Sequence, residues 1–360
     1  MPGRKFILIV LPAILLSLGF SLAEAAQAGP FDQVIEGAKK EGTVLVRLRS
    51  SFTSKSMERM EKEIKERFGV GLKIQFSPSS SMSRALAESI MEHKVGAPPS
   101  FDLMNFSNHV IDGMKLGVLE RVDWLPLITK DSNPEVVMNH PAFRGAITYY
   151  TSYQGLMYNS QKVPADKVPK TLKDLANPQW KGKIGLNRGT DAWPRWAFVL
   201  GKDKVFADLR AILKNGALQG QYSDLQNRYL LGEIWMAFSI SSYMNAANEK
   251  GVPTKWQCVE LGEVQNFSLS VRKGARHPNA AKLVALYLAS PQGARFTLEE
   301  SNAGNLFYPG NYENDIRVQN KKQGISDIFI DRNPQIIDFY TGKEFEKWEK
   351  EVDMIMKMGG

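Results

Sequence analysis

Apolar positions follow two different periods along this chain. In the N-terminal third, segments with an apolar residue at about every third or fourth position alternate with short apolar runs. The first pattern is typical of amphipathic helices and the second of buried strands. The alternation of the two patterns predicts helices at 31–40, 56–68, 81–95 and 110–116, and strands at 43–48, 72–76 and 101–106. Such alternation indicates a parallel sheet with helices on both faces.

The pattern continues through the rest of the chain. Further strands are predicted at 155–158, 183–186, 235–240 and 267–271, and further helices at 206–214, 280–288, 292–301 and 343–358. The last helix has an apolar face, so we expect it to pack against the fold; this face consists of Phe345, Trp348, Val352 and Ile355. No internal repeat or long linker interrupts the sequence. Two α/β lobes joined by several chain crossings are therefore expected.

The first residues have the three parts of an export signal. Arg4 and Lys5 precede an uncharged run at 6–20, and Ala23 and Ala25 are the small residues that a signal peptidase needs. The run is shorter than the ~20 residues of a membrane-spanning helix, and a proline interrupts it. We therefore predict a cleavable signal peptide at 1–25, with an uncleaved anchor as the alternative. Because no cysteine lies near the cleavage point, the expected product is a periplasmic protein that is not a lipoprotein.

Composition excludes several classes of protein. Apolar residues make up 43% and charged residues 23% of the 360 residues, which is typical of a globular chain and not of a disordered or multi-span membrane protein. The formal charge is +8. Lysines and arginines alternate with glutamates in the helix at 56–68, however, so no basic stripe for nucleic acid is expected. The single cysteine, Cys258, excludes a disulfide framework and a cysteine-rich metal site within one chain.

Catalytic and cofactor motifs are missing from the sequence. It contains no GxSxG, HExxH or GxxxxGK[ST] pattern, and no GxGxxG follows a predicted strand. No two of the four histidines are spaced as metal ligands, and the acidic pairs lack supporting spacing. We therefore predict that the protein is not an enzyme and holds no cofactor.

Four phrases between residues 153 and 293 resemble a known family. They are YQGLMYNSQKV at 153–163, NPQWKGKI at 177–184, KGARHPNAAK at 273–282 and YLASPQG at 287–293. In this order and spacing they resemble the periplasmic solute-binding proteins of ABC importers, in the subgroup that includes the ferric-iron-binding proteins. The N-terminal third agrees with that family in layout only.

The resemblance implies an α/β fold of two lobes, the type II periplasmic binding fold. Each lobe would be a mostly parallel sheet flanked by helices, and the chain would cross the hinge twice, near 146–155 and 264–269. The family's mode of action implies a monomer that closes on its solute and presents it to a permease in the inner membrane. The implied boundaries place lobe 1 at 26–148 and 267–305, and lobe 2 at 149–266 and 306–360.

Three polar loops follow predicted strands, at 50–54, 77–81 and 187–191. In open α/β sheets, ligands bind beyond the carboxyl ends of the strands, where helix N-termini present free N–H groups. The hydroxyls of these loops would therefore form an anion cradle, although helix capping alone is the alternative. The predicted ligand-binding residues are Ser51, Thr53, Ser80, Ser81, Arg84, Asn187, Arg188, Thr190, Trp193, Ser241 and Tyr243.

Four of these residues have specific expected roles. Arg188 would supply a bidentate charge, and Ser241 and Tyr243 would supply hydrogen bonds. Trp193 would supply a flat apolar wall. Packing within the lobe is the alternative for Trp193, and solvation is the alternative for Arg84.

Ferric iron is the other cargo that the resemblance raises. The ferric-binding members carry two adjacent tyrosines where this chain has Ser242 and Tyr243, and two phenolates are needed to hold Fe(III) well. Tyr149 and Tyr150 are also adjacent, but they fall in the predicted hinge strand, where alternation would send their rings to opposite sides. No metal site is therefore expected, with Tyr243 as the ligand if iron binds.

The sequence thus predicts the substrate-binding component of an ABC importer, which captures a small anionic solute between its lobes. A ferric-iron-binding periplasmic protein is the alternative within the same class. An exported enzyme or a ligand sensor on the same fold is the second alternative. The identity of the solute stays open among phosphonates, sugar phosphates, carboxylates and polyols.

Overall fold

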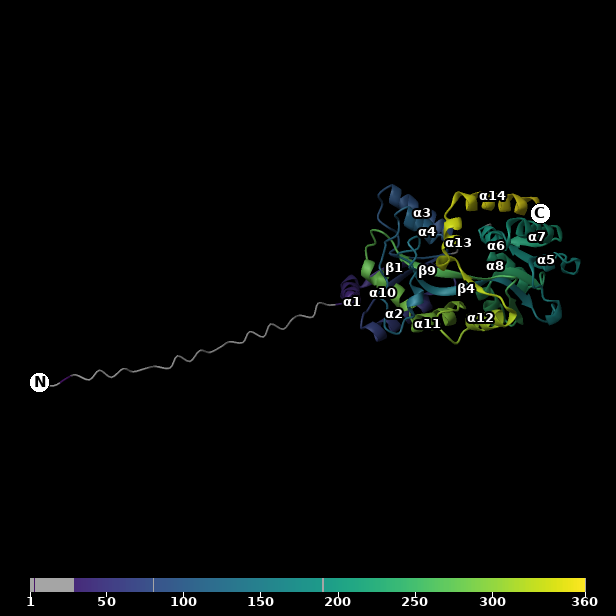
Figure 1. The fold of residues 1–360 in the computed structure, drawn as a ribbon. Helices are drawn as coiled ribbons and strands as arrows, with labels where there is room; N and C mark the ends of the chain where they lie inside the picture. Colours follow the sequence, from purple (N-terminus) through teal and green to yellow (C-terminus); the bar gives the residue numbers. More distant parts are fainter. Residues whose placement is uncertain (1–2, 4–28, 80, 190, 360) are drawn as a thin grey trace.

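A computed structural model describes residues 3, 29–79, 81–189 and 191–359, whose fold is shown in Figure 1. The predicted signal peptide at 1–25 lies outside these residues, apart from Gly3. The strands are β1 (Thr43–Arg49), β2 (Lys73–Ser79), β3 (Leu103–Phe106), β4 (Ile147–Asn159), β5 (Ile184–Asn187), β6 (Leu218–Gly220), β7 (Met236–Ile240), β8 (Thr254–Gln257), β9 (Gly262–Val271) and β10 (Asp327–Phe329). The helices are α1 (Pro30–Glu41), α2 (Ser54–Phe68), α3 (Met82–Lys94), α4 (Val110–Lys115), α5 (Leu172–Leu175), α6 (Ala192–Leu200), α7 (Lys202–Lys214), α8 (Tyr222–Leu230), α9 (Ser241–Glu249), α10 (Pro278–Leu288), α11 (Pro291–Ser301), α12 (Tyr312–Gln323), α13 (Pro334–Tyr340) and α14 (Lys343–Met358).

The helices and strands predicted in the N-terminal third are confirmed, with ends shifted by a few residues. Several short or polar elements were not predicted, among them β10, α8, α9 and α12. The reason is clearest in α12, whose buried face consists of Glu313, Ile316 and Asn320. A helix that buries mostly polar side chains lacks the apolar period that reveals a helix in the sequence.

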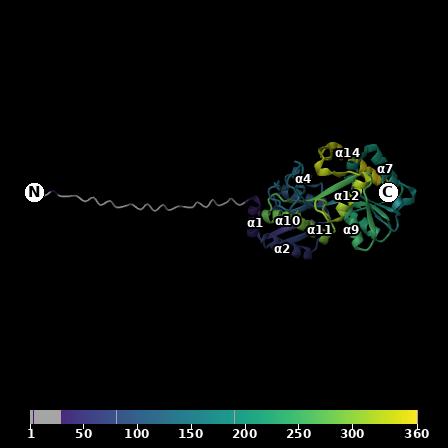
Figure 2. The ribbon, with the colours of Figure 1, turned by 60° about the horizontal axis from the view of Figure 1, so that its bottom comes forward.

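The strands form one mixed sheet in the order β2-β1-β3-β9-β4-β7-β5-β6, with β10 beside β9 and β8 beside β4. β1 pairs in parallel with β2 and β3, and β5 pairs in parallel with β6 and β7. β4 and β9 lie between these two parallel groups (Figure 1, Figure 2). The predicted architecture of two α/β lobes, each built on a mostly parallel sheet, is confirmed.

The long strands β4 and β9 connect the two lobes. They pair in antiparallel with each other, while β9 also pairs with β3 of lobe 1 and β4 with β7 of lobe 2. Their pairing contains a bulge: Thr148 and Tyr150 pair with the consecutive Ser268 and Phe267, which leaves Tyr149 as the extra residue. The connection between the lobes is therefore a two-stranded ribbon with a local irregularity.

The bulge brings two tyrosine rings together. The ring centroids of Tyr149 and Tyr150 are 4.7 Å apart, and the rings meet edge to face. The prediction that strand alternation separates these rings is therefore wrong. Alternation holds only for regular pairing, and an extra residue shifts the orientation of the side chains that follow it.

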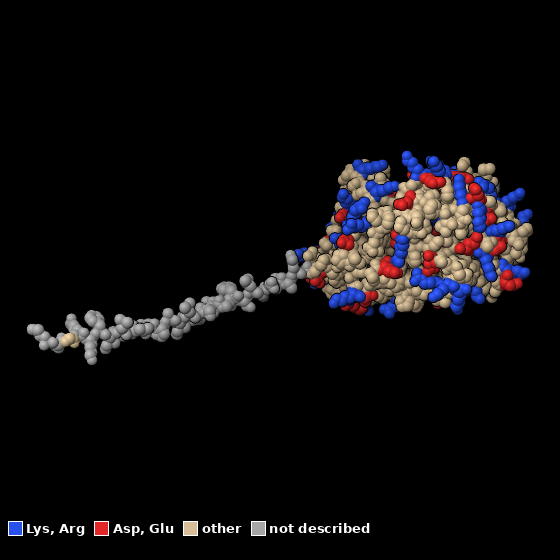
Figure 3. All heavy atoms as spheres, in the orientation of Figure 1, with Lys and Arg blue, Asp and Glu red and all other residues tan. Residues whose placement is uncertain are grey.

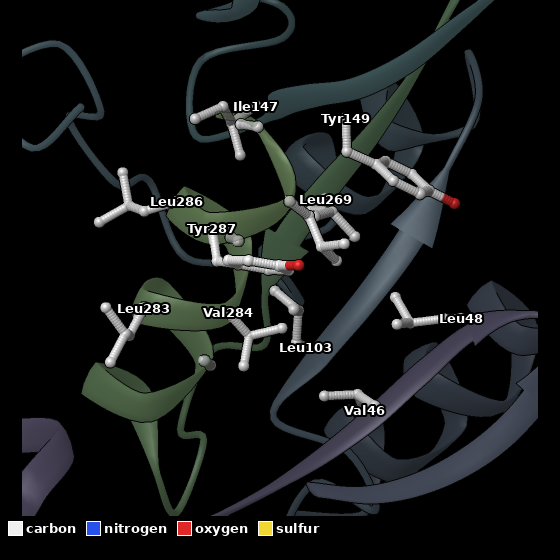
Figure 4. Packing of buried hydrophobic residues seen from close by; sticks show 14 of the residues in the cluster. Val46, Leu48, Leu103, Ile147, Tyr149, Leu269, Leu283, Val284, Leu286 and Tyr287 are labelled. Carbon is white, nitrogen blue, oxygen red and sulfur yellow. The ribbon is translucent and has the colours of Figure 1, made fainter. Parts of the chain in front are cut away.

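The core of lobe 1 lies where α10 packs against the sheet. Figure 4 shows Val46 and Leu48 of β1 together with Leu283, Val284 and Tyr287 of α10, and all five side chains are buried. α10 is apolar around most of its circumference, which is typical of a helix that is covered on all sides.

A second apolar cluster holds lobe 2 together, and α14 completes it. Phe206 of α7 and Trp196 of α6 belong to this cluster, as do Val352 and Ile355 of α14. The prediction that the last helix packs against the fold is confirmed.

The segment before α14 contacts the other lobe. Ile336 and Ile337 of α13 are buried in a cluster with Phe106 of β3 and Val110 of α4. The predicted boundaries assign 306–360 to lobe 2 and did not anticipate this contact with lobe 1. The boundaries between the two lobes stay a prediction.

Positive and negative side chains are interspersed on the molecular surface. Figure 3 shows Lys and Arg beside Asp and Glu over the face that it draws. On α2, the guanidinium of Arg59 lies 2.7 Å from Glu63, 2.6 Å from Glu299 and 2.8 Å from Glu300. Among the described helices, none has both the length and the apolar character that a membrane span requires.

A buried hydroxyl network lies beside the connecting strands. The Ser241 hydroxyl lies 2.8 Å from the Ser152 hydroxyl, accepts a hydrogen bond from the Tyr153 amide and donates one of 2.5 Å to Glu313. Burial raises the pKa of Glu313 to about 8, although its hydrogen bonds lower it. The carboxyl group is therefore mostly protonated at neutral pH.

We expect Gly293→Ala to destabilise the protein. A Cβ atom at Gly293 would overlap the carbonyl oxygen of Tyr287 and lie 2.5 Å from the Cα of Leu288, and backbone atoms cannot move aside as a side chain can. Overpacking of this kind costs about 1–3 kcal/mol. Urea unfolding measures the loss, and Gly71→Ala is the control because nothing lies within 4 Å of a Cβ there. Equal stabilities of the two variants would contradict this packing.

Glu313→Gln should weaken the pH dependence of stability. Between about pH 4.5 and about pH 8 the folded chain retains the proton of Glu313 while the unfolded chain has lost it, so the free energy of unfolding falls as pH rises through this window. We expect the wild-type melting temperature to fall more than that of Glu313→Gln over this range. Asp315→Asn, at an exposed position of the same helix, is the control. Parallel melting curves of the wild type and Glu313→Gln would contradict the raised pKa.

Candidate functional site

The carboxyl ends of the parallel strands meet between the two lobes. In lobe 1, β1 ends at Arg49 and β3 is followed by His109. In lobe 2, β5 is followed by Asp191, β6 by Tyr222 and β7 by Tyr243. This edge is where α/β sheets bind their ligands, because the loops and helix N-termini that follow the strands converge there.

Arg49 carries a positive charge without a counterion. Its guanidinium lies over the ring of Tyr150, 4.8 Å from the centroid. The Nη1 atom is buried and has no hydrogen-bond partner among the described residues. The groups that act on Arg49 electrostatically are the phenols of Tyr149, Tyr150, Tyr243 and Tyr312.

The phenols around Arg49 do not neutralise its charge. Burial raises the pKa of Tyr150 to about 12, and burial also raises the pKa of Tyr243. Both therefore remain protonated and neutral near pH 7. Glu313 follows Tyr312 in α12, but its pKa of about 8 leaves it mostly uncharged. The cluster around Arg49 has a net positive charge.

Two aromatic side chains of lobe 2 lie in the interface with lobe 1. Tyr222 and Tyr243 stack with 5.6 Å between their ring centroids, and both pack against the apolar cluster of lobe 1. The Tyr222 hydroxyl donates a hydrogen bond of 3.1 Å to Gln154 of β4. The two lobes are therefore in contact at the strand ends.

Asp191 belongs to a second charged group in lobe 2. Its carboxylate lies 2.9 Å from the Arg195 guanidinium, which lies 2.8 Å from Glu263 of β9. Arg195 and Glu263 are each 2% exposed, whereas Asp191 is 36% exposed. Burial raises the pKa of Asp191, but the charges of Arg195 and His109 outweigh this effect, so the net shift is downward.

His109 follows β3 in lobe 1. Its Nε2 atom lies 2.7 Å from the Ser83 hydroxyl, at the start of α3. Its Nδ1 atom is buried and has no hydrogen-bond partner in the described part of the chain. The charge of His109 is among the causes that lower the pKa of Asp191.

The predicted residues of lobe 1 lie mainly at helix starts. The side chains of Thr53 and Ser81 accept hydrogen bonds from the first turns of α2 and α3, as the capping alternative requires. Ser51 and Arg84 are exposed. Ser80 lies outside the described residues.

The predicted residues of lobe 2 are separated by the fold. The Asn187 side chain accepts a hydrogen bond of 2.7 Å from the Gly189 amide. Arg188 lines a surface hollow of about 450 Å³ beside β6 and α8. Trp193 is 2% exposed and stacks on Phe238, so it packs within lobe 2, which was the alternative to a ligand contact. Thr190 lies outside the described residues.

Two residues near β7 differ in their surroundings. Ser241 is buried in the hydroxyl network with Glu313. Tyr243 lies beside Arg49, in the interface between the lobes. Of the predicted set, Tyr243 is the residue that the structure places in the cluster around Arg49.

Sequence reasoning missed Arg49, Tyr150, Tyr222 and Asp191. Arg49 had an accessible signal, because it directly follows the predicted strand at 43–48 and precedes a polar loop. Asp191 was within a candidate loop and was passed over in the search for positive groups. Tyr150 could not be found by alternation, since the bulge changes its orientation.

No described histidine, cysteine, aspartate or glutamate side chains form a group of three or more that could hold a metal ion. Cys258 is buried, and burial raises the pKa of its thiol to about 12. The polar groups that meet between the lobes are thus the arginine, the phenols, one carboxylate and one imidazole. These groups can bind a solute through charge, hydrogen bonds and ring contacts.

A family model described as bacterial extracellular solute-binding protein matches residues 59–306, more than half of the chain. Solved structures share the fold along nearly their whole length. The periplasmic binding protein AfuA from Actinobacillus pleuropneumoniae, with exogenous fructose-6-phosphate bound, has a TM-score of 0.65 at 16% identity. Iron-bound HitA from Pseudomonas aeruginosa has a TM-score of 0.61 at 16% identity. For both, the match covers 88% of this chain and 99% of theirs.

A putative spermidine/putrescine ABC transporter protein from Listeria monocytogenes matches with a TM-score of 0.63 at 14% identity, over 88% of this chain and 99% of that one. The three titles name three different kinds of solute, so the fold does not determine the ligand. The family match and the shared two-lobed fold agree with each other and with the resemblance noted in the sequence. The chain belongs to the bacterial extracellular solute-binding proteins, which are binding proteins and not enzymes.

Proposed function

We propose that this protein captures a small anionic solute between its lobes and delivers it to a permease of the inner membrane. It would act as a monomer in the periplasm after removal of a signal peptide at 1–25. The observation that carries the proposal is the Arg49 guanidinium at the strand ends, whose Nη1 atom is buried without a hydrogen-bond partner and which has no carboxylate partner among the described residues.

A half-buried guanidinium without a counterion favours an anion for a physical reason. Moving a charge out of water costs several kcal/mol unless an opposite charge and hydrogen bonds replace the water. Arg49 lacks such a partner in the described chain, and an anionic group of the solute would supply it. Planar guanidinium groups bind carboxylates and phosphates through two parallel hydrogen bonds.

Closure of the lobes explains how binding could signal to the permease. Arg49 belongs to lobe 1 and Tyr243 to lobe 2, so a solute that touches both favours the conformation in which the lobes meet. The bulged ribbon of β4 and β9 is the flexible connection. Hinge closure around a ligand is a common form of such a change.

Ferric iron is the second candidate, because the structure brings Tyr150 and Tyr243 to the same cluster. Two phenolates are the ligands that ferric iron needs, and the sequence alone did not predict that two tyrosines would meet. However, both tyrosines have raised pKa values, and the charge of Arg49, which lies over the Tyr150 ring and acts on Tyr243, would repel Fe(III). The positive centre therefore supports an organic or phosphorylated anion over a ferric ion.

Arg49→Met should weaken binding of the preferred anion. The probes are inorganic phosphate, ethylphosphonate, propionate and fructose-6-phosphate, and isothermal titration calorimetry measures the dissociation constant of the tightest. Loss of hydrogen bonds to a charged group, at about 1.5–3 kcal/mol, corresponds to about a tenfold to hundredfold loss of affinity. Arg49→Lys should retain part of the affinity, because it keeps the charge and loses the planar fork.

The matched control is Arg47→Met, two residues earlier on β1, where the guanidinium pairs with Glu88 at the surface. Its affinity should equal that of the wild type. If Arg49→Met binds as tightly as Arg47→Met, then Arg49 is not the anion anchor. In that case Arg188→Ala and Tyr243→Phe test the sequence-predicted positions.

Native mass spectrometry of the protein purified from the periplasm should detect a bound organic or phosphorylated anion. Because the solute fills the positive centre, part of the population should retain it through purification. Denaturation then releases the molecule for identification, and the mass of the chain tests cleavage after residue 25. A coloured protein with bound iron would contradict the anion assignment and support the tyrosine cluster as the metal site.

A further inference from the structure

A third segment of the chain connects the lobes, in addition to β4 and β9. The chain packs against lobe 2 as α12, pairs with β9 as β10, continues through α13 and packs against lobe 2 again as α14. We name residues 330–342, which contain α13, the α13 segment. Figure 1 shows α13 between α4 of lobe 1 and α6 of lobe 2.

The first half of the α13 segment is anchored to lobe 1. Ile336 and Ile337 are 2% and 1% exposed, and both belong to the apolar cluster that contains Phe106 of β3. Arg332 donates a hydrogen bond of 2.9 Å to the carbonyl oxygen of Glu135 and lies 3.2 Å from its carboxylate. Glu135 lies in the loop of lobe 1 that precedes β4. This anchor therefore combines buried apolar side chains with a polar contact.

The second half of the α13 segment is anchored to lobe 2 by aromatic rings. Phe339 stacks on Phe198 of α6, with 4.5 Å between the ring centroids and 15° between the ring planes. The Phe339 ring also lies 4.9 Å from Trp348 of α14, at an angle of 60°. Residues 341 and 342 alone connect α13 to α14. Because α14 is part of the core of lobe 2, the end of α13 has to follow that lobe.

A segment that is held at both ends resists separation of the lobes. The two anchors are joined by one helix of seven residues, which is about 10 Å long and cannot stretch. Bending of the β4–β9 ribbon would therefore break the contacts at one of its ends. Exposure of the buried isoleucines or of the stacked rings to water is unfavourable, so the α13 segment favours the conformation in which the lobes are in contact.

We propose that the α13 segment is a strap that holds the lobes in contact and sets the equilibrium between the closed and open forms. The inference rests on the lobe closure of the proposed function, but not on the chemistry of the solute. A solute that stabilises the closed form binds more tightly when the strap already favours that form, since the apparent affinity scales with the competent fraction. Residues of the strap thus tune affinity without touching the solute.

The test compares Ile337→Ala with Ile355→Ala. The two substitutions remove the same atoms from buried isoleucines, which are 1% and 4% exposed. Ile355 packs within lobe 2, whereas Ile337 packs in the cluster with β3 and α4 of lobe 1. Both variants should lower the melting temperature, because both leave a cavity in a core. Only Ile337→Ala should also open the protein and weaken solute binding.

The separation of the lobes can be measured without any solute. Spin labels at Lys62→Cys of α2 and Lys214→Cys of α7, both at exposed positions, report the distance between the lobes by double electron–electron resonance. Cys258 is buried, so it should stay unlabelled. We expect Ile337→Ala to shift the distances to longer values than in the wild type, and Ile355→Ala to leave them unchanged. Calorimetry with the tightest of the four anion probes should show about tenfold weaker binding for Ile337→Ala alone.

Phe198→Ala tests the other anchor at a position that is 38% exposed, so its loss should affect folding little even if Ile337→Ala fails to fold. It should shift the distances in the same direction by a smaller amount. Unchanged distances in the folded variants would overturn the strap and leave the anion function intact. Longer distances in Ile355→Ala would also overturn it, because lost stability alone would then explain the opening. If none of the four anions binds the wild type, the proposed function fails, while the distances still decide on the strap.

Discussion

The antiparallel pairing of β4 with β9 is the constraint on which the rest of the structure depends. This pairing joins the lobes, because β9 also pairs with β3 of lobe 1 and β4 also pairs with β7 of lobe 2. The backbone hydrogen bonds of this ribbon hold the lobes side by side and bring the carboxyl ends of two parallel groups to one cleft. A two-stranded ribbon bends more easily than a broad sheet, so the same element that joins the lobes lets them move.

Two charged groups, those of Arg49 and Asp191, are held by contacts to this ribbon. Tyr150, whose ring lies against Arg49, belongs to β4. Glu263, which holds Arg195 and through it Asp191, belongs to β9. Bending of the ribbon therefore moves the binding groups together with the lobes. The hydroxyl network of Ser152, Ser241 and Glu313 adds hydrogen bonds between β4, α9 and α12 at the same place.

The fold could be predicted from the sequence to the level of two α/β lobes and most helices of the N-terminal third, because apolar periodicity reflects burial against a sheet. Helix α12 was not predicted, because the side chains that it buries are mainly polar. The site was predicted less well. Polar loops at strand ends pointed to the edge of the sheet where Arg49 and Tyr243 lie, but Thr53 and Ser81 are used there as helix caps. Arg49 and Tyr150 depend on strand pairing and on a bulge that no local pattern encodes.

Under the proposed function, the position of Arg49 would couple solute binding to closure. In an open conformation water can hydrate the guanidinium, whereas contact between the lobes removes this water and supplies no carboxylate from the described chain. The closed form without a solute would therefore carry the cost of a charge that is partly removed from water and left unpaired. An anionic group offsets that cost only when the lobes are closed. The proposed solute would thus stabilise the closed form selectively, and this selectivity is what a population shift requires of a ligand.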